Sequence, residues 1–241
     1  MLARFLEPIR TQSDTQMSVA VLEPRTGRRA VYGSQTHITA SLAKVNILAA
    51  LLLDAQRERR SLTPWETSTA ASMIQSSDND SADALWRRIG GGPGLSDANE
   101  TLGLTSTQAG TGPYWGLTRT TATDQLTLLT AVFADNSPLS EESRHLIQTF
   151  MGRIDPEQAW GVSAEGSRWQ LKNGWLQRSH SQRWAINSMG RVKAHGSTFY
   201  LVILSHGSRS MSHGISAVER AAQSAVHALC STPPPASPII G

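Results

Sequence analysis

The sequence predicts an α+β fold in which an α/β sandwich with an antiparallel sheet carries an all-helical lobe. Three observations lead to this prediction: a hairpin pattern near the start, a helical middle, and three strand patterns followed by a helix at the end. With 241 residues the chain can bury a substantial core. We expect residues 1–36 and 161–230 to form the sheet lobe, 37–160 the helical lobe, and 231–241 a disordered tail.

The first predicted elements are a short helix, a hairpin and a buried helix. Apolar residues spaced i, i+3, i+4 and i+7 predict an amphipathic helix over the first dozen residues. The stretch MSVAVLEPRTGRRAVYG, residues 17–33, predicts two strands joined by a turn at 23–27. A helix is then predicted over 41–59, apolar from Val45 to Leu53 and ending in the charged sequence RERR.

The rest of the chain is predicted to be helical up to about residue 151 and mainly strands thereafter. The predicted helices are 64–75, 81–89, 122–134 and 140–151. GGGPG at 90–94 follows a helix instead of joining a strand to a helix, which favours a C-cap and turn over a phosphate-binding loop. Three strands at 168–175, 183–192 and 197–206, then a closing helix at 215–229, complete the prediction.

Composition excludes several classes of function. The 22 basic and 19 acidic residues are interspersed, so nucleic acid is not a favoured partner. The charge-free run Val45–Leu53 is far shorter than the ~20 apolar residues of a membrane span. Cys230, the only cysteine, excludes an internal disulfide and is expected to be a small buried apolar residue. The seven histidines show no metal-binding spacing, so we expect neither metal nor cofactor. Nothing indicates an oligomeric state.

The sequence SLAK, residues 41–44, is the first candidate for chemistry. Ser41 and Lys44 lie three residues apart on one face of a predicted helix, where the amine can reach the hydroxyl. Burial of an unpaired ammonium lowers its pKa, and the neutral amine is a base that can take the proton of an attacking hydroxyl. The alternative is a lysine that extends from the first helical turn into solvent.

Two more polar motifs follow in the chain. SDN at 77–79 lies in a loop between two predicted helices, and KNG at 172–174 lies in a predicted strand. Each has an alternative interpretation: the first as a helix N-terminal cap, the second as a two-residue Asn-Gly hairpin turn.

In this order, SxxK, SDN and a variant of K-[ST]-G resemble the motifs of the serine β-lactamases and penicillin-binding proteins. That family inserts an all-helical lobe into an α/β lobe built from both ends of the chain, so the resemblance covers most of residues 1–230. It implies a β-lactamase/transpeptidase-like fold. It also implies a serine-dependent acyl-transfer enzyme that forms an acyl-enzyme at Ser41 from a small-molecule or peptide amide or ester.

The resemblance assigns roles to five residues. Ser41 corresponds to the nucleophile and Lys44 to its proton acceptor. Ser77 corresponds to the hydroxyl that relays a proton to the leaving group, and Asn79 to the amide that binds the acyl-side carbonyl and orients the lysine. Lys172 corresponds to a strand lysine whose fixed positive charge keeps the first amine neutral and attracts a substrate carboxylate.

Four further residues are expected to bind substrate. Asn173 and Gly174 follow the strand lysine, and the glycine leaves room for a substrate backbone beside the strand. The N–H of Trp175 is expected to form the oxyanion hole together with that of Ser41. Trp115 and Trp175 are expected to line an aromatic cleft for the acyl group.

The sequence departs from the family pattern in three places. Asn173 replaces the hydroxyl residue that contacts the substrate carboxylate, and Ser77 follows Ser41 by only 36 positions, which indicates a trimmed helical lobe. No carboxylate occurs between Glu100 and Asp124, where class A β-lactamases carry the glutamate that activates water for deacylation. We therefore expect acylation with poor β-lactam turnover. The acyl group would then pass to another nucleophile or be hydrolysed slowly.

Other outcomes stay open at this level. The alternatives are a penicillin-binding or ligand-sensing module, and a D,D-peptidase or weak β-lactamase. The opening MLARFLEPIRTQ is interrupted by charges and proline, so no export signal is indicated if Met1 is the natural start. The chain as written is then expected in the cytoplasm, although the family is usually exported.

Overall fold

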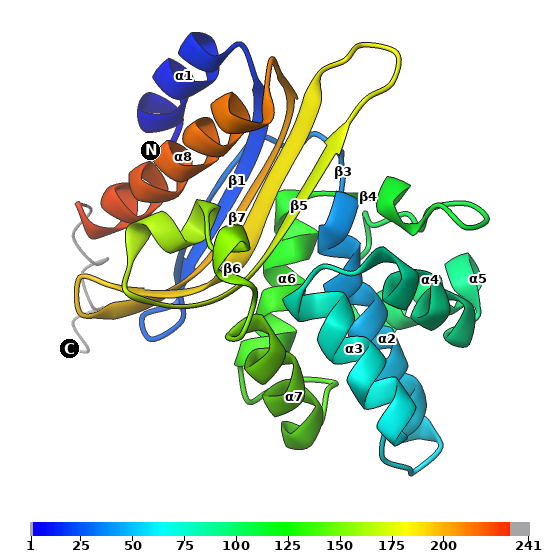
Figure 1. Ribbon diagram of the computed structural model, residues 1–241. Coiled ribbons are helices and arrows are strands. Elements are labelled where there is room, and N and C mark those ends of the chain that lie inside the picture. The colour runs from blue at the N-terminus through cyan, green and yellow to red at the C-terminus, as the bar shows by residue number, and fades with distance from the viewer. Residues whose placement is uncertain (1, 232–241) are drawn as a thin grey trace, which may run out of the picture.

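The computed structural model describes residues 2–231 and has an α+β fold built on a five-stranded antiparallel sheet (Figure 1). The strand order is β2-β1-β7-β6-β5, so strands from both ends of the chain lie side by side. The elements of this part are α1 (Leu2–Ser13), β1 (Gln16–Glu23), β2 (Arg28–Tyr32), β5 (Arg168–Gln177), β6 (Trp184–Ala194), β7 (Ser197–Ser208) and α8 (Met211–Cys230).

The segment between β2 and β5 supplies the remaining helices and a small second sheet. Its α-helices are α2 (Ala43–Arg57), α3 (Pro64–Gln75), α4 (Asn79–Arg88), α5 (Gly91–Leu102), α6 (Ala122–Phe133) and α7 (Glu141–Met151). Four 3₁₀ turns are η1 (Ala40–Leu42), η2 (Trp115–Leu117), η3 (Pro156–Gln158) and η4 (Gly161–Glu165). Strands β3 (His37–Ile38) and β4 (Arg119–Thr120) pair with each other and were not predicted.

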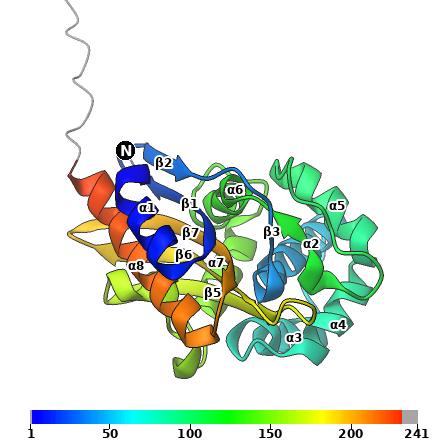
Figure 2. The same cartoon turned by 90° about the horizontal axis from the view of Figure 1, so that it is seen from above.

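The helices cover the main sheet in two layers. Helices α1 and α8 lie on one face, and α6 with the other helices of the central segment lies on the other (Figures 1 and 2). Each face has its own apolar core among the described residues. Helix α2 runs through the core of the helical layer, with Leu48 and Leu51 fully buried. The element that begins just after Ser41 is therefore held on all sides by packed side chains.

Most predicted elements are confirmed with small shifts at their ends. The amphipathic helix α1 buries Leu2, Leu6 and Ile9, and the hairpin turns at Gly27, whose φ is +71°. The three predicted strands near the end of the chain each continue two residues further than their patterns. Backbone pairing in the sheet extends a strand beyond its apolar residues, which the side-chain pattern alone does not reveal.

The prediction for GGGPG was wrong after its first residue. Gly90 ends α4 in the left-handed conformation, but Gly91 already begins α5, a helix that the sequence analysis missed. Pro93 is tolerated because N–H groups in the first turn of a helix have no helical partner. The helix is stabilised by packing of its buried face, which outweighs the poor helix propensity of glycine; the buried residues are Leu95, Ala98, Asn99 and Leu102.

Two other expectations concern the end of the chain. Cys230 is exposed, so its predicted burial was wrong: it is the last residue of α8 and lies exposed next to the buried Leu229. The tail predicted at 231–241 falls outside the described residues except for Ser231, the C-cap of α8. Within residues 2–231, no helix combines the length and apolar character needed to cross a membrane.

Candidate active site

Ser41 lies in η1, on a constrained turn at the head of α2. The preceding residue, Ala40, has a φ of +47°, a left-handed conformation that is unfavourable for a residue with a Cβ. The approach to this turn is fixed by Asn187, whose Nδ2 donates to the carbonyls of Ile38 at 2.9 Å and Thr39 at 3.1 Å. Strained backbone held by buried hydrogen bonds fixes the position of the serine before any ligand arrives.

Strand β5 packs directly against the Ser41 turn. A Cβ placed on Gly174 would lie 2.9 Å from the backbone nitrogen of Ser41 and 2.6 Å from the carbonyl oxygen of Thr39. Only glycine permits this approach, because those neighbours are backbone atoms that cannot move aside cheaply. The structure thus brings the predicted strand motif to the predicted nucleophile.

Lys44 is completely buried, so the alternative of a solvent-extended lysine was wrong. Its Nζ donates to the carbonyl of Ser77 at 2.5 Å, to the Oγ of Ser77 at 3.1 Å and to Oδ1 of Asn79 at 2.8 Å. Burial lowers the pKa of Lys44 to about 8, against the opposing influence of the carboxylates of Asp78 and Asp83. An appreciable fraction of this amine is therefore neutral near physiological pH.

Lys172 reaches the same hydroxyl from the sheet side. Its Nζ donates to the Oγ of Ser77 at 2.9 Å and to the carbonyl of Asn173 at 3.0 Å. Complete burial, reinforced by the charge of Lys44, lowers the pKa of Lys172 well below its usual range. This direction runs against the expected fixed positive charge on Lys172, because burial and the charge of Lys44 both disfavour its ammonium form.

Residues 77–79 combine the two interpretations that the sequence left open. Asp78 is the N-cap of α4, with Oδ2 accepting from the N–H of Ser81 at 2.7 Å. The neighbouring Ser77 has a φ of +54°, and it and Asn79 both contact the amine of Lys44. One short segment thus caps a helix with its middle residue and binds the lysine with its outer two.

Ser41 and Lys44 share no side-chain hydrogen bond. Among residues 2–231 no hydrogen bond joins the hydroxyl of Ser41 to the amine of Lys44, whose contacts go to Ser77 and Asn79. The predicted direct contact is thus absent. Both amines converge on Ser77 instead, so this hydroxyl is the centre of the polar network.

The side chain of Asn173 faces away from this network. Its Nδ2 donates to the carbonyls of Gln158 at 2.7 Å and Trp160 at 3.0 Å. Alternation along β5 places residues 172 and 174 on one face and 173 on the other. The structure therefore uses Asn173 to hold the segment before β5, not to border Ser41, and its position within a strand rules out the Asn-Gly hairpin turn.

Trp115, in the segment between α5 and α6, lies over the amine of Lys44. The amine lies 4.8 Å from the centre of the indole ring, and Nε1 of Trp115 donates to Oδ1 of Asp83 at 2.7 Å. Trp175, by contrast, packs against Trp160 with ring centres 6.0 Å apart. Asp83 was not predicted from the sequence; its spacing of four from Asn79, on one face of α4, was the available signal.

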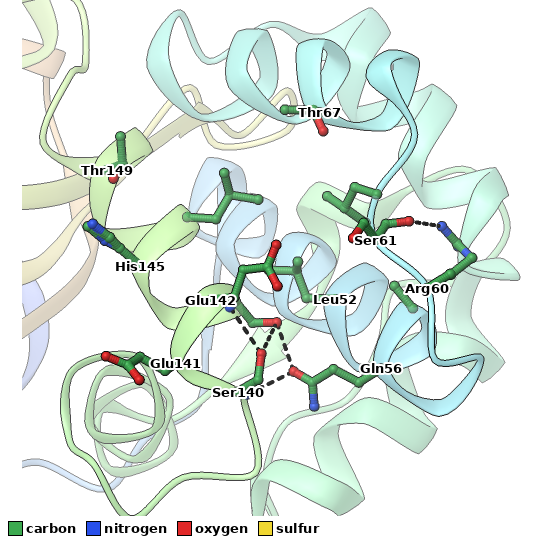
Figure 3. A pocket seen from close by; sticks show the side chains of 14 residues that line it. Leu52, Gln56, Arg60, Ser61, Thr67, Ser140, Glu141, Glu142, His145 and Thr149 are labelled. Atoms are coloured by element: carbon green, nitrogen blue, oxygen red, sulfur yellow. Dashed lines mark hydrogen bonds between the residues drawn. The ribbon is translucent and has the colours of Figure 1, made fainter.

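A separate cavity lies on the far side of the helical layer. It has a volume of about 720 Å³, is bounded by α2, α7 and the start of α3, and is shown in Figure 3. Leu52 is an apolar residue of its wall, and Gln56 accepts hydrogen bonds there from the N–H of Ser140 at 2.8 Å and the hydroxyl of Ser143 at 2.8 Å. None of the predicted site residues lines it, so this cavity is distinct from the candidate active site.

Residues 66–229 match the sequence profile of the Beta-lactamase enzyme family. The chain belongs to this family. Its curated relatives include the putative lipoprotein LppW of Mycobacterium tuberculosis and of Mycobacterium bovis, each 34% identical over 109 residues. The match covers 45% of this chain and 35% of the relatives, so the chain spans about a third of their length.

Solved structures place this β-lactamase family member in the same fold. A β-lactamase from Chitinophaga pinensis superimposes with a TM-score of 0.82 at 15% identity, over 94% of this chain and 98% of that one. A point mutant of PBP-A, in its acyl-enzyme complex with penicillin G, gives a TM-score of 0.81 at 17% identity, over 96% of each chain. At such identities the likeness establishes the fold alone.

Proposed function

We propose that this protein is a serine-dependent acyl-transfer enzyme that forms an acyl-enzyme at Ser41 from an amide or ester substrate. The observation that carries the proposal is the meeting of two buried amines, those of Lys44 and Lys172, at the hydroxyl of Ser77. Burying two amines side by side is costly for stability even when both are hydrogen-bonded, and such groups with lowered pKa values are typical of catalytic sites. Family membership supports the same reaction class.

In the acylation step, the Oγ of Ser41 attacks the substrate carbonyl carbon and a tetrahedral intermediate forms. The serine proton passes to the neutral amine of Lys44, which turns toward Ser41 when substrate binds. The bond to the leaving amine or alkoxide then breaks, and the proton reaches the leaving group through Ser77, with which the lysine already shares a hydrogen bond.

The negative charge of the intermediate needs donors that are already in place. The N–H groups of Ser41 and Trp175 are proposed as this oxyanion hole. Two observations support it: Gly174 lies against the backbone of Ser41, and β5 is an edge strand, so alternate N–H groups have no strand partner. The N-terminus of α2 points its dipole toward the same place.

Lys172 is proposed to act on substrate binding. A substrate carboxylate near its amine would raise the pKa of Lys172 and return a proton to it. The resulting charge would repel a proton on Lys44 and favour the neutral base. Substrate would in this way favour the charged form of Lys172 and the neutral form of Lys44, while Asn79 orients Lys44 through its Oδ1 contact at 2.8 Å.

The acyl-enzyme is expected to be long-lived toward water. The loop between Glu100 and Asp124 has no carboxylate, and Trp115 of this loop lies over Lys44. Water activated by a glutamate on that side, as in class A β-lactamases, is therefore not expected. The acyl group then either passes to an acceptor other than water or is hydrolysed slowly through Lys44 or Ser77.

Intact-mass measurement tests the proposal. The protein is incubated with a fluorescent penicillin and with a fluorophosphonate; a stoichiometric adduct is expected on wild type and on the exposed control Ser68→Ala, and none on Ser41→Ala. Loss of a penicilloyl or acyl adduct on addition of an amine acceptor supports transfer. A penicilloyl or acyl adduct that persists after addition of the amine supports the alternative of a ligand-sensing module. Absence of an adduct with any acyl donor contradicts the enzymatic function.

A further inference from the structure

Two exposed apolar side chains lie at the turn that packs beside the residues before Ser41, and the chemistry proposed above does not use them. Tyr114, which precedes the η2 turn, is 61% exposed, and Leu117, the last residue of that turn, is 44% exposed. Within residues 2–231 only two other large apolar side chains, Val31 and Trp65, are this exposed. Exposed apolar groups gathered beside a functional site commonly contact a ligand.

The backbone of this turn is joined to the Ser41 turn. A Cβ on Gly116 would lie 4.0 Å from the Cα of Ala40, the residue before Ser41. The carbonyl of Thr118 accepts from the N–H of Thr39 at 2.8 Å. The segment that carries Tyr114 and Leu117 thus lies beside Thr39 and Ala40, the two residues before Ser41.

Contacts of the Trp115 side chain hold the η2 turn in place. Its ring lies 4.8 Å from the amine of Lys44 and its Nε1 donates to Asp83 at 2.7 Å, so the indole is held at both its face and its edge. A rigid aromatic residue between two exposed apolar ones gives a preorganised surface, which lowers the ordering cost of binding. No charged side chain occurs in the sequence from 103 to 118.

We propose that Tyr114, Trp115 and Leu117 form a subsite for an apolar acyl chain, and that the preferred acyl donors are esters or amides of acids longer than acetate. This inference rests on the proposed acyl-transfer function and names its substrate class. In the reaction, the Oγ of Ser41 bonds to the carbonyl carbon, the bond to the leaving oxygen or nitrogen breaks, and the serine proton leaves with that group. The hydrocarbon tail of the acyl group lies against the three side chains throughout.

The test uses p-nitrophenyl acetate, butyrate and hexanoate on the full chain. The rate of p-nitrophenolate release in the acylation burst is divided by the spontaneous hydrolysis rate of each ester, and acylation of Ser41 is verified by intact mass. A fully buried methylene adds about fourfold to a rate constant, and a half-buried one about twofold. Over four half-buried methylenes we expect the normalised rate with hexanoate to exceed that with acetate by about fifteenfold.

Two double variants separate this subsite from general hydrophobicity. In Tyr114→Ser with Leu117→Ser, the hexanoate-to-acetate ratio is expected to fall to about two. In Trp65→Ala with Val31→Ala, which removes apolar side chains of similar exposure elsewhere, the ratio is expected to match wild type. Circular dichroism and thermal unfolding establish that both variants are folded.

The outcomes distinguish the two levels of the proposal. Adducts on wild type that form at equal normalised rates for all three esters overturn the apolar subsite but leave the acyl-transfer function standing. An undiminished ratio in the Tyr114/Leu117 variant overturns the assignment of the subsite to this turn. Absence of any adduct at Ser41, with these esters and with a fluorophosphonate, overturns both.

Discussion

The two sides of the Ser41 turn are built in opposite ways. On the sheet side, β5 packs Gly174 against the backbone of Ser41 and delivers the fully buried amine of Lys172. On the loop side, η2 approaches less closely and exposes Tyr114 and Leu117. On the sheet side a larger side chain would clash with the Ser41 turn, whereas the loop side has space for one.

The lysine that we propose for charge control lies on the sheet side, whereas the apolar side chains that we propose to contact substrate lie on the loop side. Groups that move protons have to be positioned within a few tenths of an ångström, and a packed sheet provides that precision. Loops tolerate substitution, so they are where specificity and the fate of an intermediate change between relatives. In this protein the segment between Glu100 and Asp124 contains no carboxylate and carries Trp115 with the apolar side chains of Tyr114 and Leu117.

The largest expected contrast is between the two glycines that face the Ser41 turn. Gly174→Ala forces a Cβ to within 2.9 Å of Ser41 N, so we expect acylation to fall about a hundredfold and the free energy of unfolding to drop by about 1–3 kcal/mol. Gly116→Ala meets nothing nearer than 4.0 Å and is expected to change the acylation rate less than about threefold. Burst kinetics and urea unfolding measure both; equal effects from the two substitutions would remove the contrast.

An effect of intermediate size is expected at Lys172, where a substitution should lower activity but raise stability. Lys172→Met replaces a buried amine with an apolar side chain of similar length, so acylation is expected to fall about ten- to hundredfold. The free energy of unfolding at pH 7 should rise by about 1 kcal/mol, because the desolvation of the amine and its repulsion by Lys44 are both removed.

Lys193→Met, an exposed position on β6, is the matched control and should leave stability within about 0.5 kcal/mol. Urea unfolding and adduct formation are measured on the same samples. A loss of more than about 2 kcal/mol in the Lys172 variant alone would show that this amine holds the fold together, as a buried partner in a hydrogen-bond network does.

The smallest expected effect is a shift in the pH dependence of acylation when Asp83, the hydrogen-bond partner of Trp115, is replaced. Acylation needs neutral Lys44, so its rate should rise about tenfold per pH unit up to the lysine pKa of about 8 and level off above it. The carboxylate of Asp83 favours the ammonium form, so Asp83→Asn should lower that pKa and increase the rate at pH 7 by about two- to threefold.

In this variant the asparagine oxygen can still accept from Nε1 of Trp115, which preserves the geometry of the loop. Asp97→Asn, exposed on α5, is the control and should leave the profile in place. An inflection that moves to higher pH, or a profile that does not move at all, would contradict the assignment of Lys44 as the base.

Local patterns were sufficient for most of the fold. The spacing of apolar residues in α1 and α6 and the short β-rich runs of β5, β6 and β7 each encode their element within a dozen residues. Helix α5 was missed because its first four residues, GGPG, are poor helix formers, and only burial of Leu95 and Leu102 against other helices stabilises it. The burial predicted for Cys230 failed because residue type alone does not tell whether a helical side chain faces the core or the solvent.

The amino-acid sequence by itself determined the order of the elements, the family, and which polar residues are candidates for chemistry, because periodicity and motif spacing are local properties of a chain. Tertiary structure alone decided that Lys44 and Lys172 meet at Ser77, that Asn173 turns away, and that Trp115 with Asp83 lies over the lysine. The physical reason is that burial and charge set the protonation of an amine. Both depend on groups that are distant in the sequence and become neighbours only in the folded protein.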